Sequence, residues 1–220
     1  MPADLPAAGD RAAISGGGYK ISVKKLEILV TGVGGQGIIL ASDMIGEAAL
    51  AAGYDVKKTD TLGMAQRGGS VVSHVRASSQ VCSPLIMEGE VDLMVAFEKL
   101  EAARWASYLR PGAVAIVNQH ALPPLSVNVG NERYPDDEEV INILRQRSKG
   151  IYLVNGTSRA RELGDARTLN MFMLGCASAF LPFKVKIWKD TISQRLPSSI
   201  RQINIAAFEE GRKEIRNVRI

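Results

Sequence analysis

The stretch "VTGVGGQGII", residues 30–39, places four glycines within six positions, between an apolar run and a segment with helical spacing. The run before it, "LEILVTG", is short and rich in aliphatic residues, which is typical of a strand. The segment after it, "IILASDMIGEAALAAG", carries apolar residues at helical intervals and ends on Gly53. A strand, a glycine loop and a helix form the first half of a βαβ unit. The stretch therefore predicts an α/β fold, with Gly53 ending the helix.

The spacing Gly32-x-Gly34-x-x-Gly37 matches the fingerprint of dinucleotide-binding loops. The first glycine allows a tight turn, the second lets the backbone approach a pyrophosphate, and the third permits close packing of helix on strand. The amides at the start of the helix then face an anion. A loop whose glycines serve packing alone is the alternative. For a dinucleotide, Asp60 is the candidate ribose ligand, and a solvated loop residue is again the alternative.

The rest of the chain alternates between strand and helix patterns. Strands are expected at 54–60, 70–77, 91–97, 113–118 and 151–155, and helices at 98–109, at 135–148 and over most of the chain after 158. The pair Pro111-Gly112 is expected to turn the chain into its strand. This order predicts a Rossmann-like three-layer α/β sandwich with a mostly parallel sheet and a helical C-terminal extension. Residues 1–25 lack a periodic apolar face and are expected to form a flexible extension, with one domain over 26–220.

Composition excludes several classes of protein. With 46% apolar residues in 220, the chain can bury a continuous core. Its 27 basic and 23 acidic residues give a net charge of +4, without a basic stripe interleaved with aromatics, so nucleic acid is not an expected partner. The longest apolar run, Met171–Phe183, is shorter than the roughly 20 residues that span a bilayer. Without a membrane segment or a signal peptide, a soluble cytoplasmic protein is expected.

Residues that could carry chemistry are few. Cys82 and Cys176 are far apart and cannot supply the four thiolates that an iron–sulfur cluster usually takes, so we expect both to be buried apolar thiols. His74 and His120 are expected to be structural, hydrogen-bonded residues. The sequence has no metal-ligand cluster, no G-x-S-x-G elbow and no Walker lysine. We therefore predict no catalytic residue and no metal site. The glycine loop is expected to bind a ligand without taking part in a chemical step.

A second stretch, "TLGMAQRGGSVVSHVRAS" at residues 61–78, is the most specific motif in the chain. Together with "GVGGQGIILAS" and the C-terminal "NIAAFEEG", it resembles the gamma-type (catalytic domain III-like) component of 2-oxoacid:ferredoxin oxidoreductases. Within that family the beta subunit of indolepyruvate ferredoxin oxidoreductase is the most similar, and the match runs from about Leu26 to about Gly211. Enzymes of this family oxidatively decarboxylate a 2-oxoacid, form an acyl-CoA and reduce ferredoxin.

The resemblance also implies a division of labour. A large alpha subunit binds thiamine diphosphate with Mg and carries the 4Fe–4S clusters, through which the complex reduces ferredoxin. This chain would bind no cofactor alone, would be inactive alone, and would handle CoA as a co-substrate. The resemblance implies that one loop cradles the CoA diphosphate and that a second loop forms the opposite wall: Gly32, Gly34, Gly35, Gln36 and Gly37 in the first, and Gln66, Arg67, Gly68 and Gly69 in the second.

Several alternatives stay open at this point. Arg67 can make paired hydrogen bonds to phosphate, but it can equally be a surface arginine, and Gly68-Gly69 can be only a turn. The substrate can be indolepyruvate, phenylglyoxylate, a branched-chain 2-oxoacid or pyruvate, because the partner should shape most of that pocket. A stand-alone NAD(P)-dependent dehydrogenase and a scaffold subunit with an empty loop are the other candidates. The C-terminal helix, apolar on more than one face, is expected to pack on the sheet, with a neighbouring subunit as a further possibility.

Overall fold

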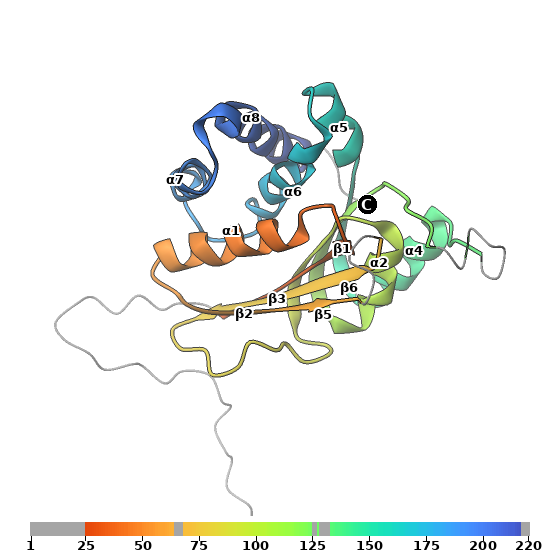
Figure 1. Ribbon diagram of the computed structural model, residues 1–220. Coiled ribbons are helices and arrows are strands. Elements are labelled where there is room, and N and C mark those ends of the chain that lie inside the picture. The colour runs from red at the N-terminus through yellow and green to blue at the C-terminus, as the bar shows by residue number, and fades with distance from the viewer. Residues whose placement is uncertain (1–24, 64–67, 125–126, 128–132, 217–220) are drawn as a thin grey trace, which may run out of the picture.

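A computed structural model describes residues 25–63, 68–124, 127 and 133–216 (Figure 1). The extension predicted for residues 1–25 lies outside this part of the chain, apart from Lys25. The described residues form one six-stranded sheet with the order β2-β3-β1-β4-β5-β6. Its strands are β1 (Leu26–Val33), β2 (Asp55–Leu62), β3 (Ser70–Ser78), β4 (Val91–Ala96), β5 (Leu109–Asn118) and β6 (Ser148–Val154).

The sheet is mostly parallel, as predicted. Strands β1, β4, β5 and β6 pair in parallel, whereas β3 runs antiparallel to both of its neighbours, β1 and β2. Residues 63–69 connect β2 to β3, and so short a connection permits only antiparallel pairing. In the strand order, β2 is an edge strand, and β3 separates it from β1.

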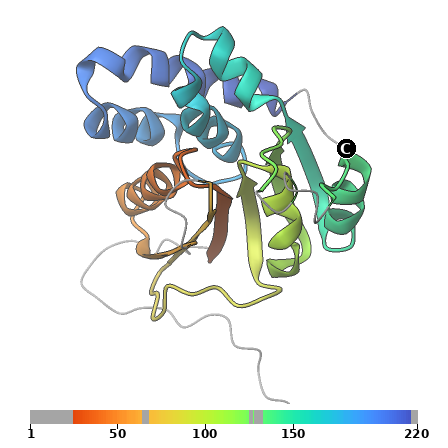
Figure 2. The ribbon, with the colours of Figure 1, turned by 45° about the vertical axis from the view of Figure 1, so that its right-hand side comes forward.

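Helices cover both faces of the sheet, which gives the predicted three layers (Figures 1 and 2). One face carries α1 (Ile38–Ala51) and α6 (Leu169–Ala177), and the other carries α2 (Lys99–Arg104) and α4 (Asp137–Arg145). Above α1 and α6 lie the remaining helices of the C-terminal extension: α5 (Gly156–Glu162), α7 (Val185–Arg195) and α8 (Ser198–Glu214). Each face of the sheet has its own hydrophobic cluster.

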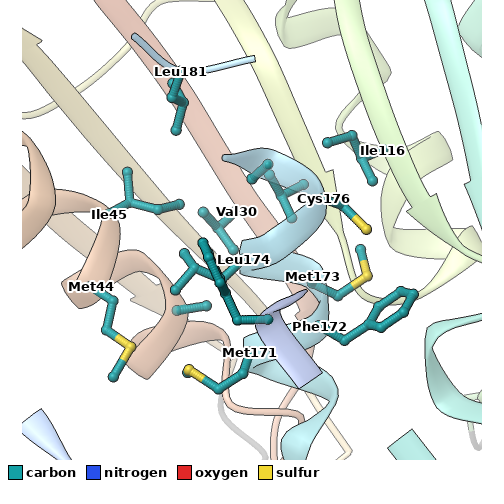
Figure 3. Packing of buried hydrophobic residues seen from close by; sticks show 14 of the residues in the cluster. Val30, Met44, Ile45, Ile116, Met171, Phe172, Met173, Leu174, Cys176 and Leu181 are labelled. Atoms are coloured by element: carbon teal, nitrogen blue, oxygen red, sulfur yellow. The ribbon is translucent and has the colours of Figure 1, made fainter. Parts of the chain in front are cut away.

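Helix α6 accounts for most of the longest apolar run in the sequence. Every residue of this helix is buried, because it lies between the sheet, α1 and α8 (Figure 3). A helix that is apolar on all sides needs such surroundings. In the described part of the chain, no helix combines the length and apolar character needed to cross a membrane.

The C-terminal helix α8 packs on α6 and α7 rather than directly on the sheet, so that expectation was wrong. The close approach rests on two facing glycines. A Cβ added at Gly175 would lie 2.1 Å from the carbonyl oxygen of Phe208, and one added at Gly211 would lie 2.0 Å from that of Phe172. Neither position has room for a side chain, so the glycines bring the two helix backbones together.

Several predicted boundaries changed, and the end of α1 was confirmed. The helix expected over 135–148 spans Asp137–Arg145, and the strand expected at 151–155 begins earlier, at Ser148. The helix expected over 98–109 ends at Arg104, and a short 3-10 helix precedes β5. Because β5 begins at Leu109, the pair Pro111-Gly112 lies inside this strand, next to a shift in its register with β6 after Ala113. Gly53, at φ +91°, is the residue after the C-cap Ala52 of α1, as predicted; its amide donates to the carbonyl oxygen of Leu50, and that of Tyr54 donates to Ala49.

Candidate functional site: a glycine loop at the carboxyl edge of the sheet

The glycine loop follows β1 in the middle of the sheet. Helix α1 leaves this loop toward one face, while α2, which follows the neighbouring strand β4, covers the other face. The chain thus turns in opposite directions at the carboxyl ends of two adjacent parallel strands. In open α/β sheets this switch point is where ligands bind.

Three glycines of the loop are needed for different reasons. A Cβ at Gly32 would lie 2.8 Å from Cβ of Phe97, so β4 leaves no room for one. Gly35 has open space around it, but its φ of +104° favours glycine. Gly37, the N-cap of α1, has a φ of +82°, and its Cβ would lie 2.7 Å from Nδ2 of Asn170.

Gln36 holds the loop in this shape. Its Oε1 accepts a hydrogen bond from the amide of Val33 (2.8 Å), and its Nε2 donates to the carbonyl oxygen of Phe97 (3.1 Å). Both polar atoms of the side chain are therefore used within the protein. Gln36 would therefore contribute to a ligand site through its backbone, not through its side chain.

The structure brings the two predicted glycine stretches together. The amide of Gly34 donates to the carbonyl oxygen of Gly69 (2.8 Å), and the amide of Gly68 lies 3.5 Å from the carbonyl oxygen of Gly34. Gln66 and Arg67, predicted for the same wall, lie outside the described residues. The described part of the second loop therefore closes one side of the first by backbone hydrogen bonds.

Two hollows open on either side of the glycine loop. The first, which we call the crevice cavity, has a volume of about 350 Å³ and is lined by both polar and apolar residues. The second, which we call the apolar hollow, has a volume of about 510 Å³. The crevice cavity is lined by Gly35, Gln36, Gly37, His120, Leu122, Thr157, Ala166, Arg167, Leu169 and Asn170. The apolar hollow is lined by Gly34, Gly35, Gly37, Ile38, Ile39, Leu62, Gly63 and Val71.

The N-terminus of α1 is open toward this region. Its N-cap is Gly37, which has no side chain to accept from the first amides, and its first turn contains no acidic residue. The first amides of a helix carry a partial positive charge and have no partner within the helix. An oxyanion is the group that such an end binds best.

A chain of side-chain amides connects the strand ends beneath the crevice cavity. The carbonyl oxygen of Phe97, after β4, accepts from both Gln36 and Nδ2 of Asn118, the last residue of β5 (3.0 Å). Asn118 Nδ2 also donates to Oγ1 of Thr157 (2.9 Å), and the amide of Thr157 donates to Asn118 Oδ1 (3.2 Å). These bonds connect the loop after β1 to the start of α5, and Gln36 and Thr157, at the two ends of the network, line the crevice cavity.

Glu98, directly after β4, is a buried carboxylate with several donors. It accepts from the amides of Glu101 (3.0 Å) and Leu122 (3.1 Å) and from the hydroxyl of Tyr134. Burial and the hydrogen bond to Glu98 raise the pKa of Tyr134 above its ordinary value, so the phenol stays protonated. Glu98 thus ties the segment after β5 to the end of β4.

The two histidines differ in their surroundings. His74 is buried; its Nδ1 accepts from the amide of Ile86 (3.3 Å), and its ring lies edge-on to Trp105 and Tyr108. Burial, and then the charge of Arg76, lower the pKa of His74. His74 is structural, as predicted. His120 lies instead on the wall of the crevice cavity.

The two cysteines also differ. Cys176 is buried in α6, as expected, and its Sγ lies 3.2 Å from the carbonyl oxygen of Gly211. Burial raises the pKa of this thiol well above its ordinary value. Cys82 is exposed on the loop between β3 and β4, so the expectation of a buried thiol was wrong there.

Asp60, the candidate ribose ligand, is already engaged. Its carboxylate accepts from Oγ of Ser73 (2.5 Å) and from Nζ of Lys58 (2.8 Å). It lies on the edge strand β2, and β3 separates that strand from the glycine loop's strand, whereas a dinucleotide site would place the acidic strand beside β1. The geometry disfavours a dinucleotide in this loop.

The sequence did not single out Asn118, Glu98, Thr157 or Asn170. Asn118 and Glu98 each stand at or directly after the end of a buried strand, and that position alone could have marked them, because parallel strands share their carboxyl edge. Thr157 and Asn170 come from later helices and reach the loop only because the C-terminal extension folds back over α1.

Comparison with known proteins identifies the family. The family model for pyruvate ferredoxin/flavodoxin oxidoreductase matches residues 27–214. The indolepyruvate oxidoreductase subunit IorB of Archaeoglobus fulgidus is 37% identical over 189 residues, which cover 85% of this chain and 94% of the relative. The same subunit of Pyrococcus horikoshii is 34% identical over 194 residues, which cover 87% and 96%.

Solved structures show the same fold. The gamma subunit of a keto/oxoacid ferredoxin oxidoreductase from Geobacter sulfurreducens has a TM-score of 0.65 at 22% identity, and the match covers 87% of this chain and 99% of that one. A 2-oxoglutarate:ferredoxin oxidoreductase from Magnetococcus marinus has a TM-score of 0.68 at 24% identity, with 88% and 31% covered. From the family match and the identity of these subunits it follows that the chain belongs to the pyruvate ferredoxin/flavodoxin oxidoreductase family and is a subunit of a 2-oxoacid:ferredoxin oxidoreductase.

Proposed function

We propose that this chain is the small, CoA-handling subunit of an indolepyruvate (aryl 2-oxoacid):ferredoxin oxidoreductase. The substrate rests on the relatives named indolepyruvate oxidoreductase subunit, which are 34–37% identical over most of their length. Subunits named for 2-oxoglutarate synthase are more distant, at 27–28%. Comparing kcat/KM of the assembled enzyme for indolepyruvate, phenylglyoxylate, pyruvate and a branched-chain 2-oxoacid tests this assignment.

The observation that carries the CoA role is the open N-terminus of α1 behind a glycine loop at the switch point of the sheet. Such an end binds phosphate oxygens, and CoA carries a diphosphate between its adenosine and its pantetheine arm. The related enzyme of Magnetococcus marinus is described with coenzyme A and succinyl-CoA bound. That description supports CoA as a ligand of an enzyme that contains a domain of this fold.

Decarboxylation and electron transfer belong to a large partner subunit in this proposal, whose thiamine diphosphate, Mg and 4Fe–4S clusters supply that chemistry. The two cysteines of the sequence are too few for the four thiolates that a 4Fe–4S cluster usually takes. In the described part of the chain no three His, Cys, Asp or Glu side chains converge, and of its two cysteines one is exposed and the other is buried in α6. The chain's own share is to bind the CoA diphosphate and so to hold the thiol where the acyl group is transferred.

The test uses Arg67, which directly precedes the Gly68-Gly69 pair that hydrogen-bonds to the glycine loop. In the assembled enzyme, Arg67→Ala should raise the KM for CoA on the order of tenfold, the loss of one charge-assisted hydrogen bond. Release of CO₂ from the 2-oxoacid should continue, because that step precedes the need for CoA. Arg67→Lys should restore only part of the affinity, since an ammonium lacks the paired geometry.

Arg145→Ala, on the exposed side of α4, is the matched control and should leave the KM for CoA unchanged. If Arg67→Ala also leaves it unchanged in an intact complex, this loop does not bind CoA. Titration of the purified chain with CoA, NAD and ADP distinguishes the CoA-handling subunit from the remaining candidate, an NAD(P)-dependent dehydrogenase. Binding of NAD with turnover by the chain alone would favour that candidate.

A further inference from the structure

The crevice cavity is lined by a buried side-chain amide whose nitrogen has no hydrogen-bond partner among the described residues. Asn170, the second residue of α6, is only 7% exposed. Its Oδ1 accepts from the amide of Met171 (2.8 Å), which fixes the orientation of the amide group. Within the described residues Nδ2 donates no hydrogen bond. Buried polar groups rarely lack a hydrogen-bond partner. A donor without one therefore indicates that a ligand or a water molecule accepts its hydrogen bond.

This nitrogen opens to the cavity rather than being sealed in the core. In the described part of the chain, the side-chain nitrogens cut off from solvent without a partner are Trp188 Nε1 and Arg201 Nε. Asn170 Nδ2 is not among them, and Asn170 lines the crevice cavity. It also lies close over Gly37, where a Cβ would come within 2.7 Å of it. The amide donor is therefore beside the open N-terminus of α1.

Thr157 adds a second donor on the far wall. Its Oγ1 accepts from Nδ2 of Asn118 (2.9 Å), so its hydroxyl proton is left to donate elsewhere. Among the described residues no acidic side chain lines the cavity, and the guanidinium of Arg167, which does line it, is paired with Asp165 (2.7 Å). The groups that face the cavity thus call for a ligand that accepts hydrogen bonds from several sides, as phosphate oxygens do.

We propose that Asn170 and Thr157 are phosphate-binding residues that donate to the CoA diphosphate held at the N-terminus of α1. This inference rests on the proposed function and places the diphosphate in the crevice cavity rather than in the apolar hollow. A volume of about 350 Å³ is at the low end for small-molecule sites. The cavity therefore takes the phosphate-bearing part of CoA and leaves the rest of the molecule outside.

The test measures CoA binding by calorimetry on the assembled enzyme without 2-oxoacid, so that no turnover is needed. Asn170→Asp keeps the shape and the acceptor for Met171 but replaces the donor by a negatively charged oxygen. We expect the Kd for CoA to rise on the order of tenfold or more, and the Kd for inorganic pyrophosphate to rise with it. Thr157→Val, which keeps the shape, should raise both by about threefold to tenfold.

Asn142→Asp, on the exposed side of α4, makes the same change of charge away from the cavity and should change neither Kd. Dephospho-CoA, which lacks the 3′-phosphate, identifies the phosphate concerned. An equal loss of affinity for CoA and dephospho-CoA in Asn170→Asp supports the diphosphate. A loss seen with CoA alone would overturn this placement.

Wild-type affinity for CoA in a folded Asn170→Asp enzyme overturns the inference and leaves the proposed function standing. If the wild-type complex binds CoA but Arg67→Ala does not weaken it, the proposed function has failed as well. Thermal melting checks the fold of each variant. Should Asn170→Asp not fold, Thr157→Val carries the test, and an unchanged Kd there contradicts the proposal.

Discussion

Gln36 shows how one side chain can determine the form of a ligand loop without facing the ligand. Both of its polar atoms bond to backbone groups, the amide of Val33 and the carbonyl of Phe97. The loop therefore stays attached to the end of β4, and the N-terminus of α1 keeps its direction. The resemblance placed Gln36 among the residues that hold CoA, but one of its side-chain partners, the carbonyl of Phe97, lies 61 residues later in the sequence.

Replacing Gln36 tests this structural role. Gln36→Glu keeps the acceptor for Val33 but sets a carboxylate oxygen against the carbonyl of Phe97, so the hydrogen bond from position 36 to that carbonyl is lost. We expect the free energy of unfolding to fall by about 1–3 kcal/mol. Urea unfolding measures it, with Gln80→Glu on the exposed turn after β3 as the control. Equal stability of the two variants would show that Gln36 does not hold the loop.

His74 predicts a pH dependence of stability. Because burial and Arg76 lower its pKa in the folded state, the unfolded chain binds the proton more tightly, at an ordinary pKa near 6.5. The stabilisation from neutral His74 is complete above that pH and is lost as the pH falls through the folded-state pKa. The urea midpoint should therefore decrease between pH 7.5 and pH 5.5. His74→Asn, whose Oδ1 replaces Nδ1 as acceptor, should flatten this slope; an unchanged slope contradicts the assignment.

At the scale of elements, the strands and helices near the glycine loop could be predicted, but their order in the sheet could not. Spacing and turn residues located β1, α1 and the left-handed Gly53 that ends α1. They gave no sign that β3 would lie between β1 and β2, because pairing depends on partners distant in sequence. Asn170 was missed for a similar reason: a polar residue at the start of an apolar helix has no visible role until α6 lies across the loop.

The contact between α6 and α8 carries a stability prediction. Gly175→Ala would place a Cβ 2.1 Å from the carbonyl oxygen of Phe208, and a backbone atom cannot move aside cheaply. We expect a loss of about 3 kcal/mol in unfolding free energy. Gly46→Ala, in the middle of α1, is the matched control: its Cβ would lie 3.6 Å from Val56, an ordinary contact, and helix propensity favours alanine by about 1 kcal/mol. Chemical denaturation measures the unfolding free energy of both variants. Equal effects of the two substitutions would mean that α6 and α8 can move apart to admit a side chain.

At the scale of the whole molecule, the described residues gather hydrogen-bonding groups at one edge of the sheet. The ends of β1, β4 and β5 and the start of α5 are joined by hydrogen bonds into one rigid edge, and the C-terminal helices close over it. Such an edge is suited to hold one end of a long ligand while a partner acts on the other end. The resemblance had already implied this role, and the structure adds the polar floor and wall of the cavity.

A subunit of this kind should be inactive alone. The purified chain should reduce no redox dye with indolepyruvate and CoA, because the proposal assigns the thiamine diphosphate and the clusters to the large subunit. Adding that subunit should restore CoA-dependent dye reduction. Activity in a preparation shown by mass spectrometry to lack the large subunit would refute the division of labour.

The central claim is that this chain holds the CoA diphosphate at its glycine loop, and the structure of the assembled enzyme with CoA bound tests it most directly. The account predicts density for the diphosphate within hydrogen-bonding distance of the backbone amides at Gly35, Gly37 and Ile38, on the side of the loop that faces Asn170. CoA bound wholly on the partner subunit, with this loop closed or empty, would contradict it.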